Sequence, residues 1–186
     1  LRYGLEAETS GGWCLAESQL AAAGIQVANA IYDPLTAFDE NLTAKPYLAE
    51  SVTPNATASE FTIKLREGVK FHDGTDLTAE VVKDNLDLLR GEKTAVEKYG
   101  RAPQLTPFIF APLADVTVSD PLTVVVTTKA PWPAFPDYLA SGRYGMMAKA
   151  QYSAPGKECA EKLIGTGPFK LVKWDRGNEM NLEKNG

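Results

Sequence analysis

The chain has 186 residues, of which 44% are hydrophobic and 23% charged, as expected of one globular domain or one lobe of a larger protein. The formal net charge is -5 and both signs are interspersed, so no basic face is predicted and nucleic acid is excluded as an expected partner. No apolar run approaches the roughly 20 residues that span a bilayer. Because the sequence opens at Leu1 without an export signal, we expect a mature piece from which any signal or lipid anchor has been removed.

The first third of the chain predicts a strand, a helix and another strand. Residues 1–7 read as a short strand, which the Thr9–Gly12 cluster ends. Apolar residues recur along 20–31 at the spacing of one helix face, and Asp33-Pro34 ends this helix. Residues 61–65 alternate between apolar and polar side chains, which predicts a strand with one buried face.

The middle of the chain predicts a turn, a capped helix and two paired strands. His72–Thr75 contains the Asp-Gly pair typical of a turn. Thr78 is placed to cap a helix with Glu80 in its first turn, and Gly91 is placed to end it. Residues 116–127 predict two strands joined by a short turn.

The last third begins with an irregular segment, because three prolines interrupt residues 130–136. A short helix is expected from Phe135. The glycine-rich loop Gly165–Pro168 then enters a strand at 169–174, and one more strand is predicted around 180–182. The mixture of strands and helices, with no internal repeat, predicts a compact α/β or α+β lobe.

Two cysteines, Cys14 and Cys159, lie far apart in the sequence. They match no close CxxC pattern, which argues against a zinc site and a thioredoxin-like motif. A single long-range disulfide fits better and would require an oxidising compartment; a loop of about 100 residues or more predicts roughly 4–5 kcal/mol of stabilisation. Two buried free thiols are the alternative.

Several separated stretches resemble one protein family. Residues 61–82, with the run FTIKLREGVKFHDG followed by LTAEVV, closely resemble the signature of the family 5 extracellular solute-binding proteins of ABC importers, the peptide-, nickel- and opine-binding class. Residues 165–171, GTGPFKL, with Trp174 shortly after, resemble the second hallmark of that family. Tyr47–Glu50 and residues 124–136 follow in the family's order, so the resemblance covers essentially the whole chain.

The resemblance implies a type II periplasmic-binding-protein fold, in which two α/β lobes enclose a cleft and the first lobe carries an extra subdomain. Family members continue well past residue 186, through a second lobe and back into the first. We therefore expect residues 1–186 to form the N-terminal part of lobe one, with a mixed sheet and the extra subdomain, and without the second lobe.

Catalytic and metal sites are not predicted. His72 is the single histidine, and its side chain diverges from that of Asp73, so the pair cannot form the base and orienting group of a catalytic triad. One histidine without further ligands nearby would also leave the coordination sphere of a metal ion incomplete. No metal site and no cofactor are therefore expected. Gly165–Pro168 lacks the Gly-Lys-Ser/Thr ending of a phosphate loop, and its glycines more plausibly let the backbone pass close to another segment or to ligand.

Arg143 and the neighbouring Tyr144 are the sharpest ligand-binding candidates. They lie in the predicted loop Ser141–Gly145, and a guanidinium suits bidentate capture of a carboxylate. In the family this region reaches the cleft, and in some metal-chelate binders an arginine nearby holds the carboxylates of the ligand. The alternative is an ordinary surface arginine.

Three further residues are candidates for ligand contact. Trp13 follows the first glycine-rich loop, which the family uses near its cleft, and an aromatic ring there can pack on a peptide or aliphatic ligand. Trp132 lies between prolines and can equally belong to the core. Glu8 can meet the amine of a ligand or a neighbouring lysine.

The resemblance implies a binding function and no enzymatic one. We expect a periplasmic or cell-surface protein, with or without a lipid anchor, that works as a monomer, captures a small solute and delivers it to a membrane permease. Peptide, nickel chelate, opine or sugar all stay open as the ligand. The main alternative is a ligand sensor or a protein-interaction module on the same fold.

Overall fold

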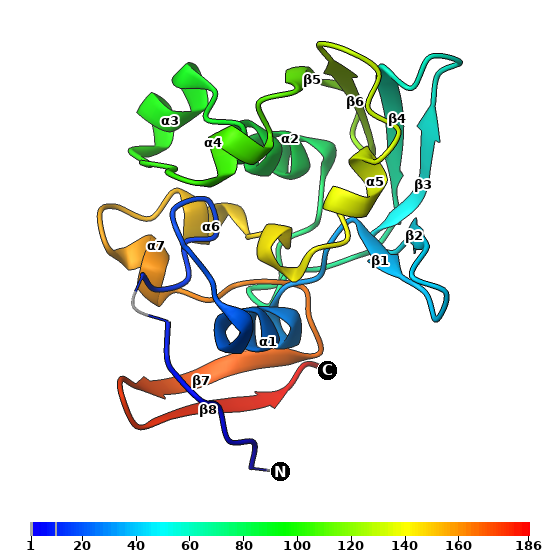
Figure 1. The fold of residues 1–186 in the computed structure, drawn as a ribbon. Helices are drawn as coiled ribbons and strands as arrows, with labels where there is room; N and C mark the ends of the chain where they lie inside the picture. The colour runs from blue at the N-terminus through cyan, green and yellow to red at the C-terminus, as the bar shows by residue number, and fades with distance from the viewer. Residues whose placement is uncertain (1, 10) are drawn as a thin grey trace.

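The structure, a computed structural model, describes residues 2–9 and 11–186. Helices and strands alternate along the chain, which confirms the predicted combination of the two (Figure 1). In chain order the elements are α1 (Ala22–Ile31), β1 (Thr36–Phe38), β2 (Ala44–Pro46), β3 (Ala49–Pro54), β4 (Glu60–Leu65), α2 (Ala79–Leu89), α3 (Lys93–Tyr99), α4 (Thr106–Ile109), β5 (Leu113–Asp120), β6 (Thr123–Thr128), α5 (Phe135–Tyr138), the 3-10 helix η1 (Gly142–Tyr144), α6 (Lys149–Tyr152), α7 (Glu158–Glu161), β7 (Phe169–Asp175) and β8 (Glu179–Lys184).

The largest sheet has four antiparallel strands in the order β3-β4-β6-β5. β4 lies inside it and confirms the predicted alternation, because Phe61, Ile63 and Leu65 are buried while the residues between them are exposed. α2 packs against β5 and β6 and covers one face of the sheet (Figure 1). This sheet and α2 surround the first of two hydrophobic cores.

α2 begins and ends where its sequence predicts. The Thr78 hydroxyl accepts a hydrogen bond from the Val81 amide at 3.4 Å, and Glu80 lies in the first turn. Val82, Leu86 and Leu89 form its buried face. The local signals for a helix start and for one apolar face therefore predicted α2 correctly.

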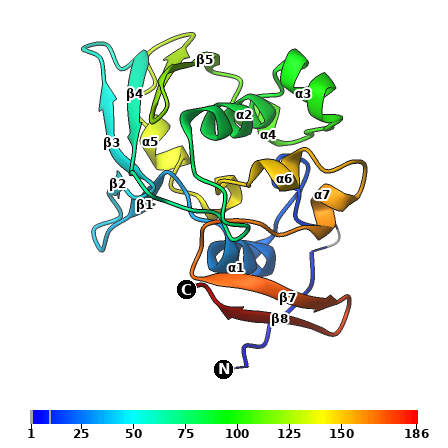
Figure 2. The same cartoon turned by 180° about the vertical axis from the view of Figure 1, so that it is seen from behind.

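A second hydrophobic core surrounds α1. The segment before α1, together with α6 and α7, packs on one side of this helix, and the β7–β8 hairpin packs on the other (Figure 2). Leu171, Trp174, Met180 and Leu182 of the hairpin face this core. The hairpin confirms both strands predicted at the end of the chain.

The two sequence stretches that carry the family resemblance meet in space. The His72 ring lies between two peptide groups of the glycine-rich loop, with its Nε2 3.0 Å from the Gly167 carbonyl and its Nδ1 accepting from the Gly165 amide at 3.4 Å. A neutral ring with hydrogen on Nε2 satisfies both contacts. Gly165 lies so close to α1 that a Cβ there would be 2.0 Å from the Ile31 carbonyl oxygen. The His72 turn and the glycine-rich loop therefore serve to pack two segments of the chain together, as the turn and glycine patterns indicate.

Two expectations need correction. The predicted strand at 1–7 is wrong for the part that the structure describes, since residues 2–7 have no strand pairing. A strand requires a partner for its backbone groups, and none of the described strands takes that place. The expected mixed sheet is also not found, because the strand pairings of the described residues are all antiparallel. Four of these pairings are hairpins with short connections, while β4 pairs with β6 across a long one.

None of the helices that the structure describes has the length and apolar character that a membrane crossing requires.

Candidate functional site

A surface hollow of about 330 Å³ lies at α5 and η1. We call it the α5–η1 hollow; its lining residues are Asp137, Tyr138, Ser141, Arg143 and Tyr144. A much smaller cavity of about 10 Å³ lies next to it, and Arg143 and Tyr144 line both. The structure thus brings two of the predicted site residues, Arg143 and Tyr144, to one shallow surface hollow.

Close packing against α1 places this segment. A Cβ on Gly142 would lie 1.8 Å from Asn29 Oδ1, so a side chain there would require Asn29 to move. The Ser141 hydroxyl accepts a hydrogen bond from the Arg143 amide at 3.4 Å and caps η1. The short helix thus lies against α1 and is capped by Ser141.

Tyr144 forms the buried wall of the hollow. Its ring meets Phe110 edge to face, with the ring centroids 4.8 Å apart. Burial raises the pKa of the Tyr144 hydroxyl, and the positive charge of Arg143 opposes that shift. The hydroxyl stays protonated at neutral pH and is available as a hydrogen-bond donor.

Arg143 is half-buried and lines the hollow. Within residues 2–9 and 11–186 it makes no ion pair and no side-chain hydrogen bond. A guanidinium carries five N–H donors in a planar arrangement that matches a carboxylate.

Trp132 supports the hollow from behind. Its ring centroid lies 5.0 Å from that of Tyr138 and 5.2 Å from that of Phe135, and its amide donates to the Ala58 carbonyl at 2.7 Å. Trp132 is partly buried against the first core and does not line the hollow. Its direct contact with a ligand stays a prediction.

Trp13 and Glu8 lie elsewhere and share a different neighbour. Only 2% of Trp13 is exposed, and its ring packs edge to face on Trp174 at 6.2 Å. The Glu8 carboxylate accepts hydrogen bonds from Trp174 Nε1 and from the Gly177 amide. Trp174 thus joins both residues to the β7–β8 hairpin, and neither lines the hollow. Their predicted ligand contacts stay predictions.

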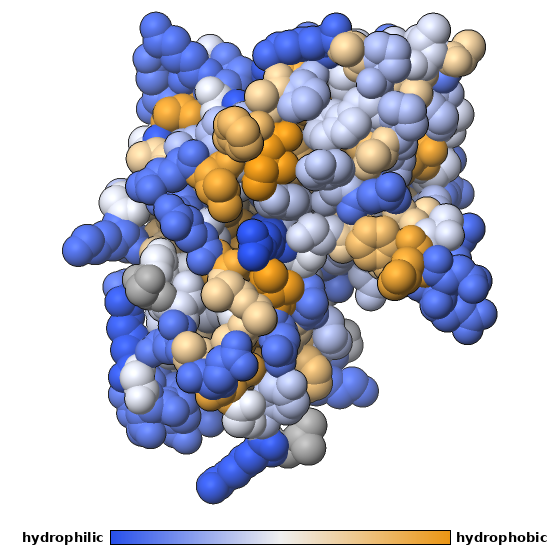
Figure 3. Space-filling view, viewed as in Figure 1, coloured by the Kyte–Doolittle hydropathy of each residue, from blue (hydrophilic) through white to orange (hydrophobic). Residues whose placement is uncertain are grey.

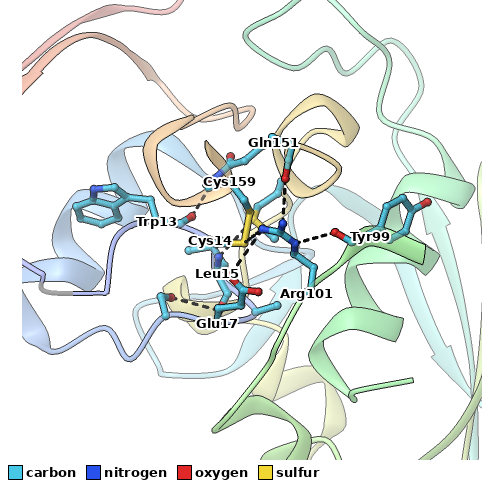
Figure 4. Close-up of a disulfide and its surroundings, with 12 residues drawn as sticks. Trp13, Cys14, Leu15, Glu17, Tyr99, Arg101, Gln151 and Cys159 are labelled. Carbon is cyan, nitrogen blue, oxygen red and sulfur yellow. Dashed lines mark hydrogen bonds and ion pairs between the residues drawn. A yellow bond between two sulfur atoms is a disulfide. The ribbon is translucent and has the colours of Figure 1, made fainter. Parts of the chain in front are cut away.

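Cys14 and Cys159 form a disulfide, which confirms the pairing favoured by their spacing and excludes two free thiols (Figure 4). Both cysteines are fully buried in the second core. Gln151 reinforces the same junction, because its amide nitrogen donates to the Trp13 and Cys159 carbonyls at 2.9 and 3.1 Å. The segment before α1 is therefore fastened to the α6–α7 region.

Arg101, which sequence reasoning did not single out, lies beside this disulfide (Figure 4). Its guanidinium is buried and donates to the Tyr99 and Ala154 carbonyls at 3.0 and 2.9 Å, while Glu17 lies 3.7 Å away as a counter-charge. A buried guanidinium needs such partners to offset the loss of water. The local sequence around Arg101 carries no signal of this role, because Ala154, Glu17 and the disulfide lie far away along the chain.

The segment before α1 reaches the small cavity next to the hollow. Leu15, next to Cys14, lines the small cavity together with Arg143 and Tyr144, and its amide donates to Met147 Sδ at 3.3 Å. Leu105 lines the same cavity, and Phe108 one turn away is 84% exposed. Figure 3 shows apolar side chains gathered on the surface around α4, toward the upper left. The hollow is thus bordered by an apolar surface on its α4 side.

The site offers binding groups and no arrangement for metal chemistry. Among the described residues, no group of three or more His, Cys, Asp or Glu side chains is placed to hold a metal ion. The groups at the hollow are a free guanidinium, a free carboxylate, two phenols and a hydroxyl. They can position a polar solute by charge and hydrogen bonds.

Comparison with known proteins identifies relatives of this chain. The family described as Bacterial extracellular solute-binding proteins, family 5 Middle, matches residues 43–186. The glutathione-binding protein GsiB of Escherichia coli (strain K12) is 34% identical over 158 residues, which are 85% of this chain and 29% of that protein.

Two solved structures have the same fold. The binding protein AgaA from A. tumefaciens R10, in complex with agropinic acid, is 28% identical with a TM-score of 0.79, covering 95% of this chain and 34% of its own. The oligopeptide-binding protein AppA from Bacillus subtilis, in complex with a nonapeptide, is 27% identical with a TM-score of 0.76, covering 92% and 33%. These likenesses confirm the predicted type II periplasmic-binding-protein fold. The chain spans about a third of the length of these relatives, and it belongs to the family 5 bacterial extracellular solute-binding proteins.

Proposed function

We propose that this chain is part of the solute-binding component of an ABC importer, which captures a small solute outside the cytoplasm and delivers it to a membrane permease. Membership of the solute-binding family supports this proposal, as do relatives named for binding glutathione, agropinic acid and a nonapeptide. The Cys14–Cys159 disulfide favours the same location, because disulfides persist in oxidising compartments.

The observation that carries the proposal is Arg143, which lines the α5–η1 hollow and has no ion-pair partner among the described residues. Tyr144 forms one wall beside it and Tyr138 another. A free guanidinium in a concave aromatic surface is suited to hold a carboxylate of the solute. Arg143 is therefore the main ligand-binding residue in this part of the protein, with Tyr144 beside it.

The mechanism is conformational. The solute binds first to the open surface of one lobe, and an opposing lobe then closes over it. Because the solute contacts both lobes only in the closed form, its binding shifts the population toward that form. The permease recognises the closed form, and ATP hydrolysis at the membrane supplies the energy. The chain itself supplies binding groups and makes or breaks no bond.

The proposal predicts that Arg143→Ala in the complete protein weakens an acidic ligand. Loss of a bidentate charged contact should reduce the affinity by a factor of about 10 to 100, since hydrogen bonds to charged groups contribute about 1.5–3 kcal/mol. The ligand is found first, by native mass spectrometry of small molecules that co-purify with the protein. Calorimetry with that ligand then compares the wild type with Arg143→Ala.

Lys173→Ala is the matched control, because Lys173 is an exposed cation on β7 outside the hollow. It should leave the affinity unchanged. Unchanged affinity in Arg143→Ala would remove Arg143 from the site. A stable complex with another protein, without any bound small molecule, would instead favour a protein-interaction module.

A further inference from the structure

Two short segments carry the pattern Asn-x-Thr, which is the acceptor pattern for N-linked glycosylation. They are Asn41-Leu42-Thr43, between β1 and β2, and Asn55-Ala56-Thr57, between β3 and β4. Both asparagines are exposed, so exposure does not distinguish them. The hydrogen bonds of the two side chains do distinguish them, and they single out Asn41.

The side chain of Asn55 is committed to its own turn. Its Oδ1 accepts hydrogen bonds from the Ser59 and Glu60 amides at 3.0 and 3.3 Å and from the Thr57 hydroxyl at 3.2 Å. Its Nδ2 donates to the Ser59 hydroxyl at 3.3 Å, and that hydroxyl also bonds the Thr57 hydroxyl at 2.8 Å. The amide and the hydroxyl that define an acceptor are therefore both engaged within this turn.

The side chain of Asn41 is not engaged in this way. Asn41 lies at the tip of the β1–β2 hairpin, which projects from the body of the molecule in both views (Figures 1 and 2). Through residues 2–9 and 11–186, neither the Asn41 side chain nor the Thr43 hydroxyl makes a hydrogen bond, and only the backbone amides of these two residues bond Asp39. The acceptor amide and the hydroxyl two residues later are both available to an enzyme.

An acidic residue precedes Asn41 by two positions. Asp39 completes the run DENLT, whereas Thr53 takes the corresponding place before Asn55. Acceptor sites of bacterial oligosaccharyltransferases carry Asp or Glu at this position, where a carboxylate can be held by two hydrogen bonds from an arginine. The Thr43 amide lowers the pKa of Asp39, and the Asn41 amide adds to the effect, so the carboxylate is ionised at neutral pH. The run is thus a fuller match than Asn-x-Thr alone.

The hairpin tip can open without disturbing a core. A transferase holds its acceptor in a conformation of its own, so the turn must open first. Two backbone hydrogen bonds of 3.0 Å close it, from the Asp39 amide to the Thr43 carbonyl and from the Leu42 amide to the Asp39 carbonyl. Residues 40–43 are exposed, and Leu42 has a φ of 58°, in the left-handed region that leucine rarely adopts. Opening therefore removes no side chain from a core and releases an unfavourable backbone conformation.

We propose that Asn41 is the acceptor of an N-linked oligosaccharide, transferred outside the cytoplasm by a membrane oligosaccharyltransferase from a polyprenyl-diphosphate donor. Asn41 Nδ2 attacks the anomeric carbon of the first sugar and forms the N–C bond. The C–O bond to the diphosphate breaks, the polyprenyl diphosphate leaves, and a base of the transferase takes the amide proton. The inference rests on the export that the proposed function includes, which the Cys14–Cys159 disulfide favours, and it needs no particular solute.

The test uses the complete protein, exported in bacterial cells that contain an oligosaccharyltransferase and its lipid-linked donor. The protein carries a flexible C-terminal tag that repeats DENLT between glycine-serine spacers, and an established acceptor protein is produced in the same cells. Mass spectrometry of proteolytic peptides measures the fraction of each asparagine that bears the oligosaccharide. Asn41 should be modified, and Asn55 should stay unmodified.

Variants of the hairpin separate recognition by the enzyme from a structural role. Asn41→Gln and Thr43→Ala should abolish modification of the hairpin, and Thr43→Ser should keep it. Asp39→Asn should slow modification by about tenfold, the size expected for a lost charged contact. Asparagine still offers Oδ1 to the two amides, so this variant removes the charge and keeps the turn. Glu40→Gln is the matched control, because Glu40 is an exposed acid in the same turn outside the motif, and it should keep the wild-type rate.

The outcomes test both the sequence and its place in the fold. A modified tag with an unmodified Asn41 would show that the folded hairpin withholds the acceptor, and would overturn the proposal. If the established acceptor is modified and neither the tag nor Asn41 is, the run is not an acceptor and the proposal falls. Equal modification of Asn55 would overturn the selection of Asn41. An unmodified Asn41 leaves the carrier function standing, and absence of a bound solute leaves the acceptor assignment standing.

Discussion

Asp33 and Asp39 lie close together in the sequence, and their surroundings shift their pKa values in opposite directions. Burial raises the pKa of Asp33, against the opposing effects of a hydrogen bond from Thr166 at 2.9 Å and the nearby His72. The amides of Thr43 and Asn41 donate to Asp39 at 2.9 Å and lower its pKa. Folding thus disfavours the ionised form of Asp33 and favours the ionised form of Asp39.

We expect Asp33→Asn to stabilise the protein at neutral pH by up to about 1 kcal/mol, the size typical of a single substitution. A raised folded pKa means that Asp33 contributes stability below its unfolded pKa, and that this contribution is lost as pH rises through the folded pKa. The gain of the variant should therefore grow from pH 3 to pH 7. Urea unfolding across this range measures it.

Asp39→Asn is the matched control, since the lowered pKa of Asp39 gives the opposite sign. Its contribution is present above the unfolded pKa and is lost as pH falls, so this variant should be less stable than wild type at pH 7 and equal to it in acid. A pH-independent difference for Asp33→Asn would contradict the assigned shift.

Among the elements, α2 joins the first core to the second, because Val81 touches both. Its start depends on Thr78, whose hydroxyl accepts from the otherwise unpaired amide of the first turn. Thr78→Ala should lower the free energy of unfolding by about 1 kcal/mol, while Thr78→Ser should keep most of it because serine caps as well. Urea denaturation of both variants measures the difference. Equal loss in both would show that the hydroxyl is not the cause.

At the scale of the whole molecule, the disulfide closes a loop of 145 residues. The chain-entropy treatment gives about 5 kcal/mol for a loop of this length. Reduction should therefore lower the melting temperature strongly, and thermal unfolding with and without reductant measures the effect. The Cys14→Ala/Cys159→Ala double variant should melt like the reduced protein and show no response to reductant. Two reactive thiols in unreduced, unfolded protein would contradict the bond.

Elements whose signals are local could be predicted from the sequence. The alternation along β4, the Thr78 cap and the turn at His72–Thr75 each depend on residues close together in the chain. The family motifs also indicated the fold, because each motif is a contiguous run of residues. The opening strand failed because pairing depends on a distant partner, which no local pattern reports.

The candidate site was predicted in part. Arg143 and Tyr144 could be found because their short loop carries a charge with the geometry for a carboxylate. Asp137 was missed, since one acidic residue in a short helix carries no signal until folding places it beside the same hollow.

By itself, the sequence determined the family and most of the elements, because these depend on contiguous residues and their chemistry. Only the tertiary structure decided which charged side chains share a surface. It placed Trp13 in the core and committed Glu8 to Trp174 and Gly177. For Trp13 and Glu8 the physical reason is that their burial and pairing are set by contacts with residues more than a hundred positions away, whose free energies a local pattern does not encode.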